Sequence, residues 1–336
     1  MIALREKIMN NLDIVSIGEL LVDFTGFSSE DGSSAYKLNA GGAPANVACM
    51  ASKLGSKAGF IGKIGRDMFG FYLKSELLKN GIDTSGLIID KNYKTTMAFV
   101  KNREDGERDF EFYREESWSA DLNLRYGEVN REMIDSCRVL HFGSLCLTAE
   151  PARTAVLNSV EYAKSKGKLV SYDPNYRPLL WQNEEYAKST IRSAIRFSDI
   201  IKVSEEELKL LTDCETMTLS IAKLFSEGVR VLCITQGAKG CIVATPRSIH
   251  AYPSFKVETV DTLGAGDSFF GGFLHKLCKT NKTLEELEQE DIAAMAMVGN
   301  ACGALTSSKK GAIPAMPDAE QVQTLLDSYR TEEKKS

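Results

Sequence analysis

The sequence predicts an α/β fold: a mainly parallel sheet with helices on both faces. From about residue 139 onward, short β-rich segments alternate with segments of helical periodicity, which is typical of parallel sheets. With 336 residues, of which 43% are hydrophobic, the chain is long enough for one large α/β domain with a small appendage. In this class ligands lie at the carboxyl ends of the strands, so the residues that follow each strand are the first candidates for a site.

Composition and charge exclude several function classes. The net charge of −5 disfavours nucleic-acid binding, and no run of about eighteen apolar residues predicts a membrane span. The eight cysteines are scattered without a CxxC pair, as expected for free thiols in a reducing cytoplasm. The three histidines form no recognisable triad, so histidine-based catalysis has little support. We therefore expect a cytoplasmic protein with a small-molecule partner.

The first hundred residues alternate between strand and helix patterns. A run of β-forming residues ends in Gly18, and Pro44 follows a glycine pair at a position that suits the first turn of a helix. Gly81 closes the next helical segment. In order, the expected elements are a strand at 13–18, a loop at 28–34, a helix after 41–46, a strand at 57–64 and a helix at 69–80.

Residues 95–100 and 108–113 predict a β-hairpin that interrupts this rhythm. Their side chains alternate in the strand manner around Asp105-Gly106, a dipeptide typical of tight hairpin turns. The α/β rhythm then returns. In order, the further elements expected are strands at 141–145, 168–173, 199–203 and 230–235, and helices at 151–166, 184–197, 205–211 and after residues 267, 284 and 318.

The segment GAGD, residues 264–267, sets small residues directly against a carboxylate. Gly264, Ala265 and Gly266 lack bulk, and the apolar run that follows predicts a helix starting near Asp267, whose free N–H groups favour phosphate. Asp is also a preferred helix cap and Gly a preferred turn residue, which explains the pattern without any function. The functional interpretation is a base that takes the proton from a hydroxyl attacking the phosphate. The segment alone leaves both interpretations open.

Three other segments follow predicted strands. TQGAKG, at 235–240, offers a Thr hydroxyl and glycine backbone to a phosphate, although a plain turn explains it equally well. The acids at 205–207 complement the dipole of a starting helix, whereas Asp173 and Arg177 in DPNYRP exceed what a turn needs. Neither a P-loop nor a dinucleotide fingerprint occurs, so a bound nucleotide needs another cradle and a dehydrogenase is disfavoured.

Two segments together resemble the signatures of the PfkB, or ribokinase-like, carbohydrate kinase family. They are GGAPANVACMASKLGSKAGFIGKIG at 41–65 and DTLGAGD at 261–267, and the resemblance runs from about residue 13 to residue 317. DGERDFEFYREESWSADL and DPNYRPLLW look most like fructokinases, and 2-keto-3-deoxygluconate kinases share the second phrase. The resemblance implies a ribokinase-like domain at 12–330, with a small β-lid formed by segments of about 22–40 and 94–124.

The resemblance also implies roles for individual residues. Asp267 is the expected catalytic base, and Gly264, Ala265 and Gly266 form the expected anion hole. The expected sugar-binding residues are Asp23, Gly42, Asn46, Phe99, Arg114 and Arg177. The expected nucleotide-binding residues are Lys202, Glu207, Thr235, Gly237, Gly240 and Asn300, with residues 311–314 near the adenine. Glu207 is the expected Mg²⁺ contact, through water, and Asp261 matches a position near a K⁺ site; the family's Asn before this Glu is Ser204 here, whose role stays open.

From the resemblance we expect an ATP-dependent sugar kinase that converts D-fructose to fructose 6-phosphate, with Mg²⁺ required and K⁺ dependence left open. A kinase for 2-keto-3-deoxygluconate or for a nucleoside is the close rival, and a sugar sensor without catalysis is the distant one. The expected partners are the sugar and ATP, with no nucleic acid and no membrane. Because lids of relatives pair across dimers, we also expect a homodimer through the lid.

Overall fold

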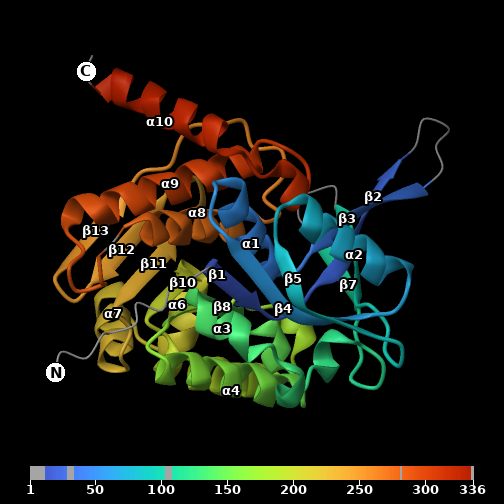
Figure 1. The fold of residues 1–336 in the computed structure, drawn as a ribbon. Coiled ribbons are helices and arrows are strands. Elements are labelled where there is room, and N and C mark those ends of the chain that lie inside the picture. Colours follow the sequence, from blue (N-terminus) through green and yellow to red (C-terminus); the bar gives the residue numbers. More distant parts are fainter. Residues whose placement is uncertain (1–11, 29–33, 103–107, 281, 334–336) are drawn as a thin grey trace, which may run out of the picture.

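A nine-stranded sheet runs through the middle of the described part of the chain (Figure 1). The computed structural model describes residues 12–28, 34–102, 108–280 and 282–333. The strand order is β13-β12-β11-β10-β9-β8-β1-β4-β5, with an antiparallel hairpin at one edge of an otherwise parallel sheet. The strands are β1 (Leu12–Ile17), β4 (Ala58–Gly65), β5 (Asp83–Asp90), β8 (Cys137–Gly143), β9 (Leu169–Asp173), β10 (Ile200–Ser204), β11 (Val231–Thr235), β12 (Cys241–Thr245) and β13 (Ser248–Tyr252).

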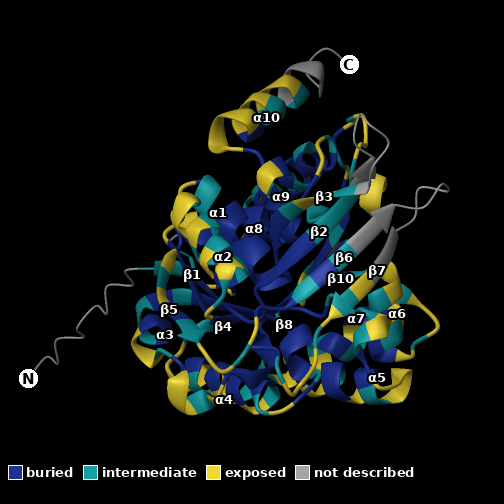
Figure 2. Ribbon diagram, turned by 90° about the vertical axis from the view of Figure 1, so that its right-hand side faces the viewer, coloured by how far each residue is buried: buried dark blue, intermediate teal, exposed yellow. Residues whose placement is uncertain are grey.

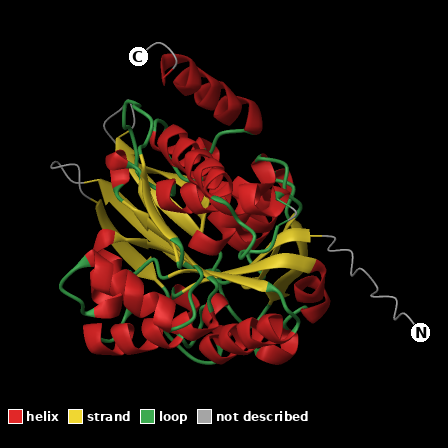
Figure 3. Ribbon diagram, turned by 90° about the vertical axis from the view of Figure 1, so that its left-hand side faces the viewer, coloured by secondary structure: helices red, strands yellow, loops and turns green. Residues whose placement is uncertain are grey.

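Helices cover both faces of this sheet, which confirms the predicted fold class (Figure 3). One layer consists of α3 (Arg131–Ser136), α4 (Ala152–Ser165), α5 (Glu184–Ser193), α6 (Glu205–Thr212) and α7 (Met217–Ser226). The other consists of α1 (Ala43–Lys53), α2 (Met68–Lys79), α8 (Ala265–Lys279) and α9 (Gln289–Ser307), with α10 (Ala319–Glu333) packed on the outside of α9. None of the described helices has the length and apolar character needed to cross a membrane.

The two helical layers bury the faces of the sheet in separate apolar clusters (Figure 2). Under α4, the rings of Phe142 and Tyr172 stack with centroids 4.5 Å apart. On the opposite face, Phe270 and Phe273 of α8 pack toward Val47 of α1. This packing fixes the start of α8 over the carboxyl ends of the central strands, where a site is expected.

A second, smaller sheet stands at the edge of the main body (Figure 1). Its order is β3-β2-β6-β7, from β2 (Leu21–Ser28), β3 (Ser34–Gly41), β6 (Met97–Asn102) and β7 (Arg108–Tyr113). The predicted hairpin is therefore present as β6 and β7, while its turn at 103–107 lies outside the described residues. The loop predicted at 28–34 is flanked by strands, and its interior, 29–33, also lies outside them.

Several elements were not anticipated from the sequence pattern. These are the edge strands β5 and β13, the strand β12 next to β13, and the helices α3 and α7. The prediction at 184–197 was too long, since α5 ends at Ser193 and a short 3-10 turn follows at Ile195–Phe197. An edge strand such as Ser248–Tyr252 faces solvent along much of its length, so it lacks the apolar run by which the buried parallel strands were recognised.

Candidate active site

The GAGD segment forms the beginning of α8. Gly264 precedes the helix with φ 73°, in the left-handed region, and a Cβ there would lie 2.8 Å from the Cβ of Ala312. Only glycine fits this position without strain. The amide of Ala265 donates to the carbonyl of Thr262 (3.2 Å), whereas the first-turn amides of Gly266 and Asp267 have no intrahelical acceptor. Because Ala265 already uses its N–H, the free donors of the expected anion cradle are the amides of Gly266 and Asp267.

Asp267 is buried at the end of this cradle and is held by α1. Its Oδ2 accepts a hydrogen bond from Nδ2 of Asn46 at 2.8 Å. Burial raises the pKa of the Asp267 carboxyl, and the charge of Lys202, the Asn46 hydrogen bond and Arg177 oppose that rise. The Oδ1 of Asn46 is buried without a hydrogen-bond partner among the described residues, so it can accept from a ligand hydroxyl. One amide thus orients the carboxylate and offers an acceptor beside it.

Asp23 brings a second carboxylate to the same place from the small sheet. It pairs with Asn39 of β3 and Ala98 of β6, and its carboxylate lies where a Cβ on Gly41 would need space. Burial and the charge of Asp267 raise the pKa of Asp23 and Arg177 lowers it, with a resulting value of about 7. Two buried carboxylates that lie close enough to interact, beside an open amide acceptor, suit a ligand with several hydroxyl groups.

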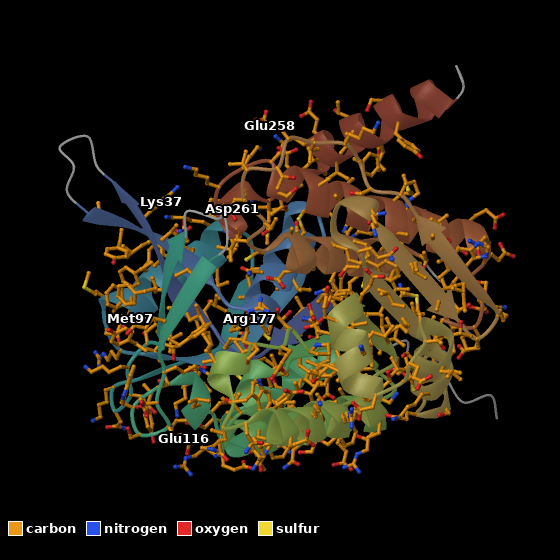
Figure 4. All side chains as sticks on the ribbon, turned by 180° about the vertical axis from the view of Figure 1, so that it is seen from behind. Lys37, Met97, Glu116, Arg177, Glu258 and Asp261 are labelled. Carbon is orange, nitrogen blue, oxygen red and sulfur yellow. The ribbon has the colours of Figure 1, made fainter. Side chains whose placement is uncertain are left out.

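Gly42 and Arg177 are the other expected sugar-binding residues near these acids. Gly42 has φ 112°, and a Cβ there would lie 2.4 Å from the carbonyl oxygen of Glu19, so α1 can start only with glycine before it. Arg177 is partly exposed, and its Nη1 donates to the carbonyl of Tyr176 at 3.1 Å. Figure 4 shows Arg177 near the centre of the view, below Asp261, which lies in the loop before α8.

Two residues expected to bind sugar lie elsewhere. Phe99 pairs with Phe24, the neighbour of Asp23, so its side chain is on the opposite face of the small sheet, where it stacks on Phe24 at 4.7 Å. Arg114 follows β7 and is buried in the protein. Its guanidinium binds Asp121 (2.8 Å), the Thr148 hydroxyl (3.0 Å) and the carbonyl of Leu145 (2.9 Å). The sequence could not reveal these two positions. The face of the sheet on which Phe99 lies depends on how β6 pairs, and the acceptors for Arg114 are brought to it by tertiary packing.

A cavity of 650 Å³ opens on the other side of the α8 start. The residues expected to bind nucleotide that line it are Thr235, Gly237, Gly240 and Asn300, together with Ala265 and Gly266. Asn300 donates from Nδ2 to the carbonyls of Tyr252 (3.1 Å) and Pro253 (3.0 Å). It thereby anchors the segment after β13, which forms a wall that the sequence analysis missed; that segment lacked any motif.

The segment 311–314, expected near an adenine, lies instead against the start of α8. Ala312 packs on Gly264, and the amide of Gly311 donates to Oδ2 of Asp261 at 2.9 Å. The other oxygen of Asp261 accepts from the amide of Leu263 at 2.8 Å. The described residues include no group of three or more His, Cys, Asp or Glu side chains that could hold a metal ion. A cation at Asp261 would therefore need backbone oxygens as further ligands.

Lys202, Asp173 and Glu207 gather beneath the cradle, at the carboxyl ends of β9 and β10. Nζ of Lys202 pairs with Oδ2 of Asp173 at 3.0 Å, and both side chains are buried. Burial raises the pKa of Asp173 while Lys202 lowers it, and the neighbouring acids keep the pKa of Lys202 above its usual range. The sequence segment DPNYRP had indicated Asp173 and Arg177 as candidates. Both lie at the site, one at each end of the same turn.

Glu207 has both carboxylate oxygens engaged by backbone donors. One oxygen accepts from the amide of Tyr176 (2.7 Å) and the other from the amide of Ser204 (2.8 Å). The hydroxyl of Ser204 accepts in return from the amide of Glu207 (3.1 Å), which makes a capping box at the start of α6. Ser204 therefore has a structural role, and Glu207 differs from the exposed Glu205 and Glu206.

Glu19 is a functional candidate that the sequence analysis missed. It is fully buried after β1, and its Oε1 accepts from the amide of Ala43 at 3.0 Å. Since Gly42 has no side chain to cap α1, the Glu19 carboxylate caps it from another segment. Burial raises the pKa of Glu19 to about 7, and Arg114 lowers it. In the sequence, the only indication of Glu19 was that a charged residue follows Gly18 at the carboxyl end of a predicted strand.

Comparisons with known proteins found similar sequences and structures along nearly the whole chain. The model of pfkB family carbohydrate kinases matches residues 11–319. The "Probable fructokinase-3" of Arabidopsis thaliana is 44% identical over 323 residues, which cover 94% of this chain and 92% of that protein. A fructokinase from Xylella fastidiosa with bound ATP is 30% identical with a TM-score of 0.87, over 95% of this chain and 99% of that one. A double mutant of fructokinase from Vibrio cholerae O395, bound to fructose, ADP and potassium ion, is 30% identical with a TM-score of 0.85, over 94% and 99%.

Proposed function

The chain belongs to the pfkB family of carbohydrate kinases, and we propose that it transfers the γ-phosphoryl group of ATP to fructose, forming ADP and fructose 6-phosphate. The observation that carries this proposal is the position of Asp267. Its carboxylate lies between a pocket suited to hydroxyl groups, around Asp23 and Asn46, and the first-turn amides of α8. A hydroxyl in the pocket and a phosphate at the amides would meet at this carboxylate.

Phosphoryl transfer depends mainly on positioning and on charge stabilisation, with little covalent help from the protein. In the proposed step the sugar oxygen attacks the γ-phosphorus, the bond from that phosphorus to the oxygen of the β-phosphate breaks, and Asp267 accepts the hydroxyl proton. The amides of Gly266 and Asp267 face the transferred group, where a preformed donor typically contributes about 10²- to 10³-fold. Asn46 keeps the base oriented toward the pocket.

The 650 Å³ cavity is the proposed nucleotide site. Its volume lies in the range of small-molecule and cofactor pockets. Thr235 with Gly237 and Gly240 would lie along the phosphates, while Asn300 and the segment after β13 would form the wall toward the base. Lys202 would face the phosphate from beneath, because a Cβ on Gly266 would lie only 3.0 Å from its Nζ.

The residues fit Mg²⁺ held mainly by the nucleotide. Each oxygen of Glu207 already accepts one backbone N–H but keeps further lone-pair capacity, which suits contact through water. When bound, Mg²⁺ neutralises charge on the phosphates. Asp261 and the backbone around Gly311 are the proposed place for K⁺, the cation bound in the Vibrio cholerae fructokinase structure.

The small sheet is the proposed lid of a domain that spans residues 12–330. Its inner face presents Asp23 to the sugar pocket. Its outer face carries an aromatic group of Phe24, Tyr36, Phe99 and Tyr113, of which Tyr36 and Tyr113 are 52% and 46% exposed. We propose that a second copy of the chain covers this face and forms a homodimer. In sedimentation experiments, Tyr36→Ser should then shift the protein from dimer toward monomer. A wild-type protein that is already a monomer, or a variant that remains fully dimeric, would contradict the proposed dimer.

The described cysteines are all free thiols and seven of them are buried, which supports our proposal of a reducing, cytoplasmic location.

The function itself is tested by offering the purified protein ATP with fructose, glucose, 2-keto-3-deoxygluconate or adenosine in a coupled ADP assay. We expect kcat/KM to be highest for fructose. A strong preference for the acid sugar or the nucleoside would reject fructose as the substrate. If no acceptor led to ADP formation, the proposed kinase activity would be rejected.

A further inference from the structure

Lys202 lies in an electrostatically unfavourable position for a cation. Its ammonium is buried at the carboxyl end of β10, close enough to the first turn of α8 that a Cβ on Gly266 would lie 3.0 Å from Nζ. The start of a helix carries partial positive charge from its free amides. A buried ammonium beside it needs nearby anions, and a bound phosphate supplies them only while the nucleotide is present.

Asp173 provides the permanent anion. Its Oδ2 lies 3.0 Å from Nζ of Lys202, on the neighbouring strand of the sheet, and the side chain is fully buried. Its Oδ1 accepts from the amide of Asn175 at 3.1 Å, in a turn where Asn175 has the left-handed φ of 42°. Both oxygens are thus fixed, one by the lysine and one by the backbone, so the carboxylate cannot turn away.

Asp267 is the competing partner for this lysine. The two groups are close enough for the charge of Lys202 to be the largest influence that lowers the pKa of the Asp267 carboxyl. A direct contact between them would occupy the oxygen that must accept the sugar proton. It would also draw the ammonium away from the phosphate position at Gly266.

We propose that Asp173 is a positioning residue of the kinase: it anchors Lys202 beside the anion cradle and keeps the ammonium from pairing with the catalytic carboxylate of Asp267. The inference rests on the proposed phosphoryl transfer. Asp173 touches neither sugar nor nucleotide in this account and acts only through Lys202. Its removal should therefore reduce kcat far more than it changes the KM for fructose.

The test compares Asp173→Asn with a matched variant at the opposite end of the same strands. Asp199 is also buried, pairs with Lys164 at 2.6 Å and accepts from the amide of Val170. Asp199→Asn therefore removes a comparable buried carboxylate without affecting the site. We expect Asp173→Asn to lower kcat about tenfold or more with fructose KM nearly unchanged, an effect the size of a lost electrostatic contact to the transferred group. We expect Asp199→Asn to lower only the melting temperature.

The double variant Asp173→Asn/Lys202→Met separates positioning from a direct effect. If Asp173 acts through Lys202, the double variant has the same kcat as Lys202→Met alone. This comparison also holds if Asp173→Asn fails to fold, because the double variant removes both members of the buried pair. Normal kcat in folded Asp173→Asn, or a double variant clearly slower than Lys202→Met, would overturn the inference. An inactive wild type would instead reject the proposed function.

Discussion

Lys63 and Lys202 are both buried lysines near the carboxyl ends of strands in one sheet, yet their surroundings differ. Nζ of Lys63, on β4, contacts Asp90 (2.9 Å), Glu128 (2.9 Å) and the carbonyl of Asn123 (3.1 Å). All three of its protons are used. Nζ of Lys202 has one hydrogen-bond partner among the described residues, Asp173, and faces the start of α8.

This difference separates a structural charge from one available to a ligand. A buried ammonium that is saturated by protein acceptors has no donor left to offer, so Lys63 can only stabilise the junction of β4, β5 and the segment before α3. Lys202 keeps donor capacity and lies where phosphate is expected. Burial alone therefore does not identify a functional lysine, whereas an incomplete set of partners beside a helix start does.

Replacing one carboxylate near each lysine should give the largest difference in kcat between the two surroundings. Asp267→Asn removes the base and should lower kcat at least about a hundredfold with fructose KM largely kept, because a general base typically contributes about 10²- to 10⁴-fold. Asp90→Asn, beside Lys63, should leave kcat within about twofold. Steady-state assays with ATP and fructose measure both, and near-normal turnover of Asp267→Asn would remove it as the base.

Exchanging the lysines themselves should separate activity from stability. Lys202→Met should lower kcat about tenfold to a hundredfold, with a smaller change in melting temperature. Lys63→Met leaves the partly exposed carboxylates of Asp90 and Glu128 without their cation and should cost about 1–3 kcal/mol of unfolding free energy, while kcat per folded molecule is kept. Urea unfolding monitored by circular dichroism gives the free energies. Equal losses of kcat in the two variants would contradict the distinction between these lysines.

Asp90, beside Lys63, and Asp23, near Asp267, should respond differently to pH. Backbone and Lys63 hydrogen bonds lower the pKa of Asp90, whereas burial raises the pKa of Asp23 to about 7. Asp23 is ionised above that value, so we expect kcat/KM for fructose to fall roughly tenfold from pH 8 to pH 6. Because the folded state holds this proton more tightly than the unfolded chain, the same group makes the fold progressively less stable as pH rises from about 4 to about 7.

A pH series of kcat/KM tests this expectation, and Arg177→Gln provides the check. Arg177 lowers the pKa of Asp23, so its loss should move the acid limb to higher pH. A flat profile between pH 6 and pH 8 would show that Asp23 does not control sugar binding.

Two glycine substitutions should give the smallest effects. In Gly266→Ala the new Cβ meets only the flexible end of Lys202, so kcat should fall about two- to fivefold with little loss of stability. In Gly86→Ala, on β5, the new Cβ meets Ile61 at 2.8 Å and the backbone of Phe60 at 3.0 Å. That overpacking should cost about 1–3 kcal/mol without changing kcat. If Gly266→Ala instead changes only stability, Lys202 does not face the transferred group.

Much of the main sheet was predictable because its parallel strands are buried runs and its helices have clear ends. Gly81 after α2 and Pro44 in the first turn of α1 are local signals of this kind. The edge strand β13 and the strands β2 and β3 of the small sheet were not, since their residues are partly exposed and β2 pairs with the distant β6.

The candidate site divides in the same way. GAGD, Asn46 and the residues around Thr235 were found because their types and positions in sequence carry the signal. Phe99 lies on the face of the small sheet opposite to Asp23, and this depends on how β6 pairs with β2. The burial of Arg114 depends on acceptors from two other segments, at Asp121 and at 145–148. Glu19 was missed because its function is to cap a helix that begins 24 residues later.

The most direct test of the account follows the phosphates themselves. ³¹P NMR of the wild type with ATP, Mg²⁺ and fructose should show equal amounts of ADP and fructose 6-phosphate accumulating as ATP disappears. Asp267→Asn should leave nearly all of the ATP intact over the same period, since the base that accepts the sugar proton is gone. ADP with inorganic phosphate in place of the sugar phosphate, or equal conversion by both proteins, would contradict a sugar kinase that depends on Asp267.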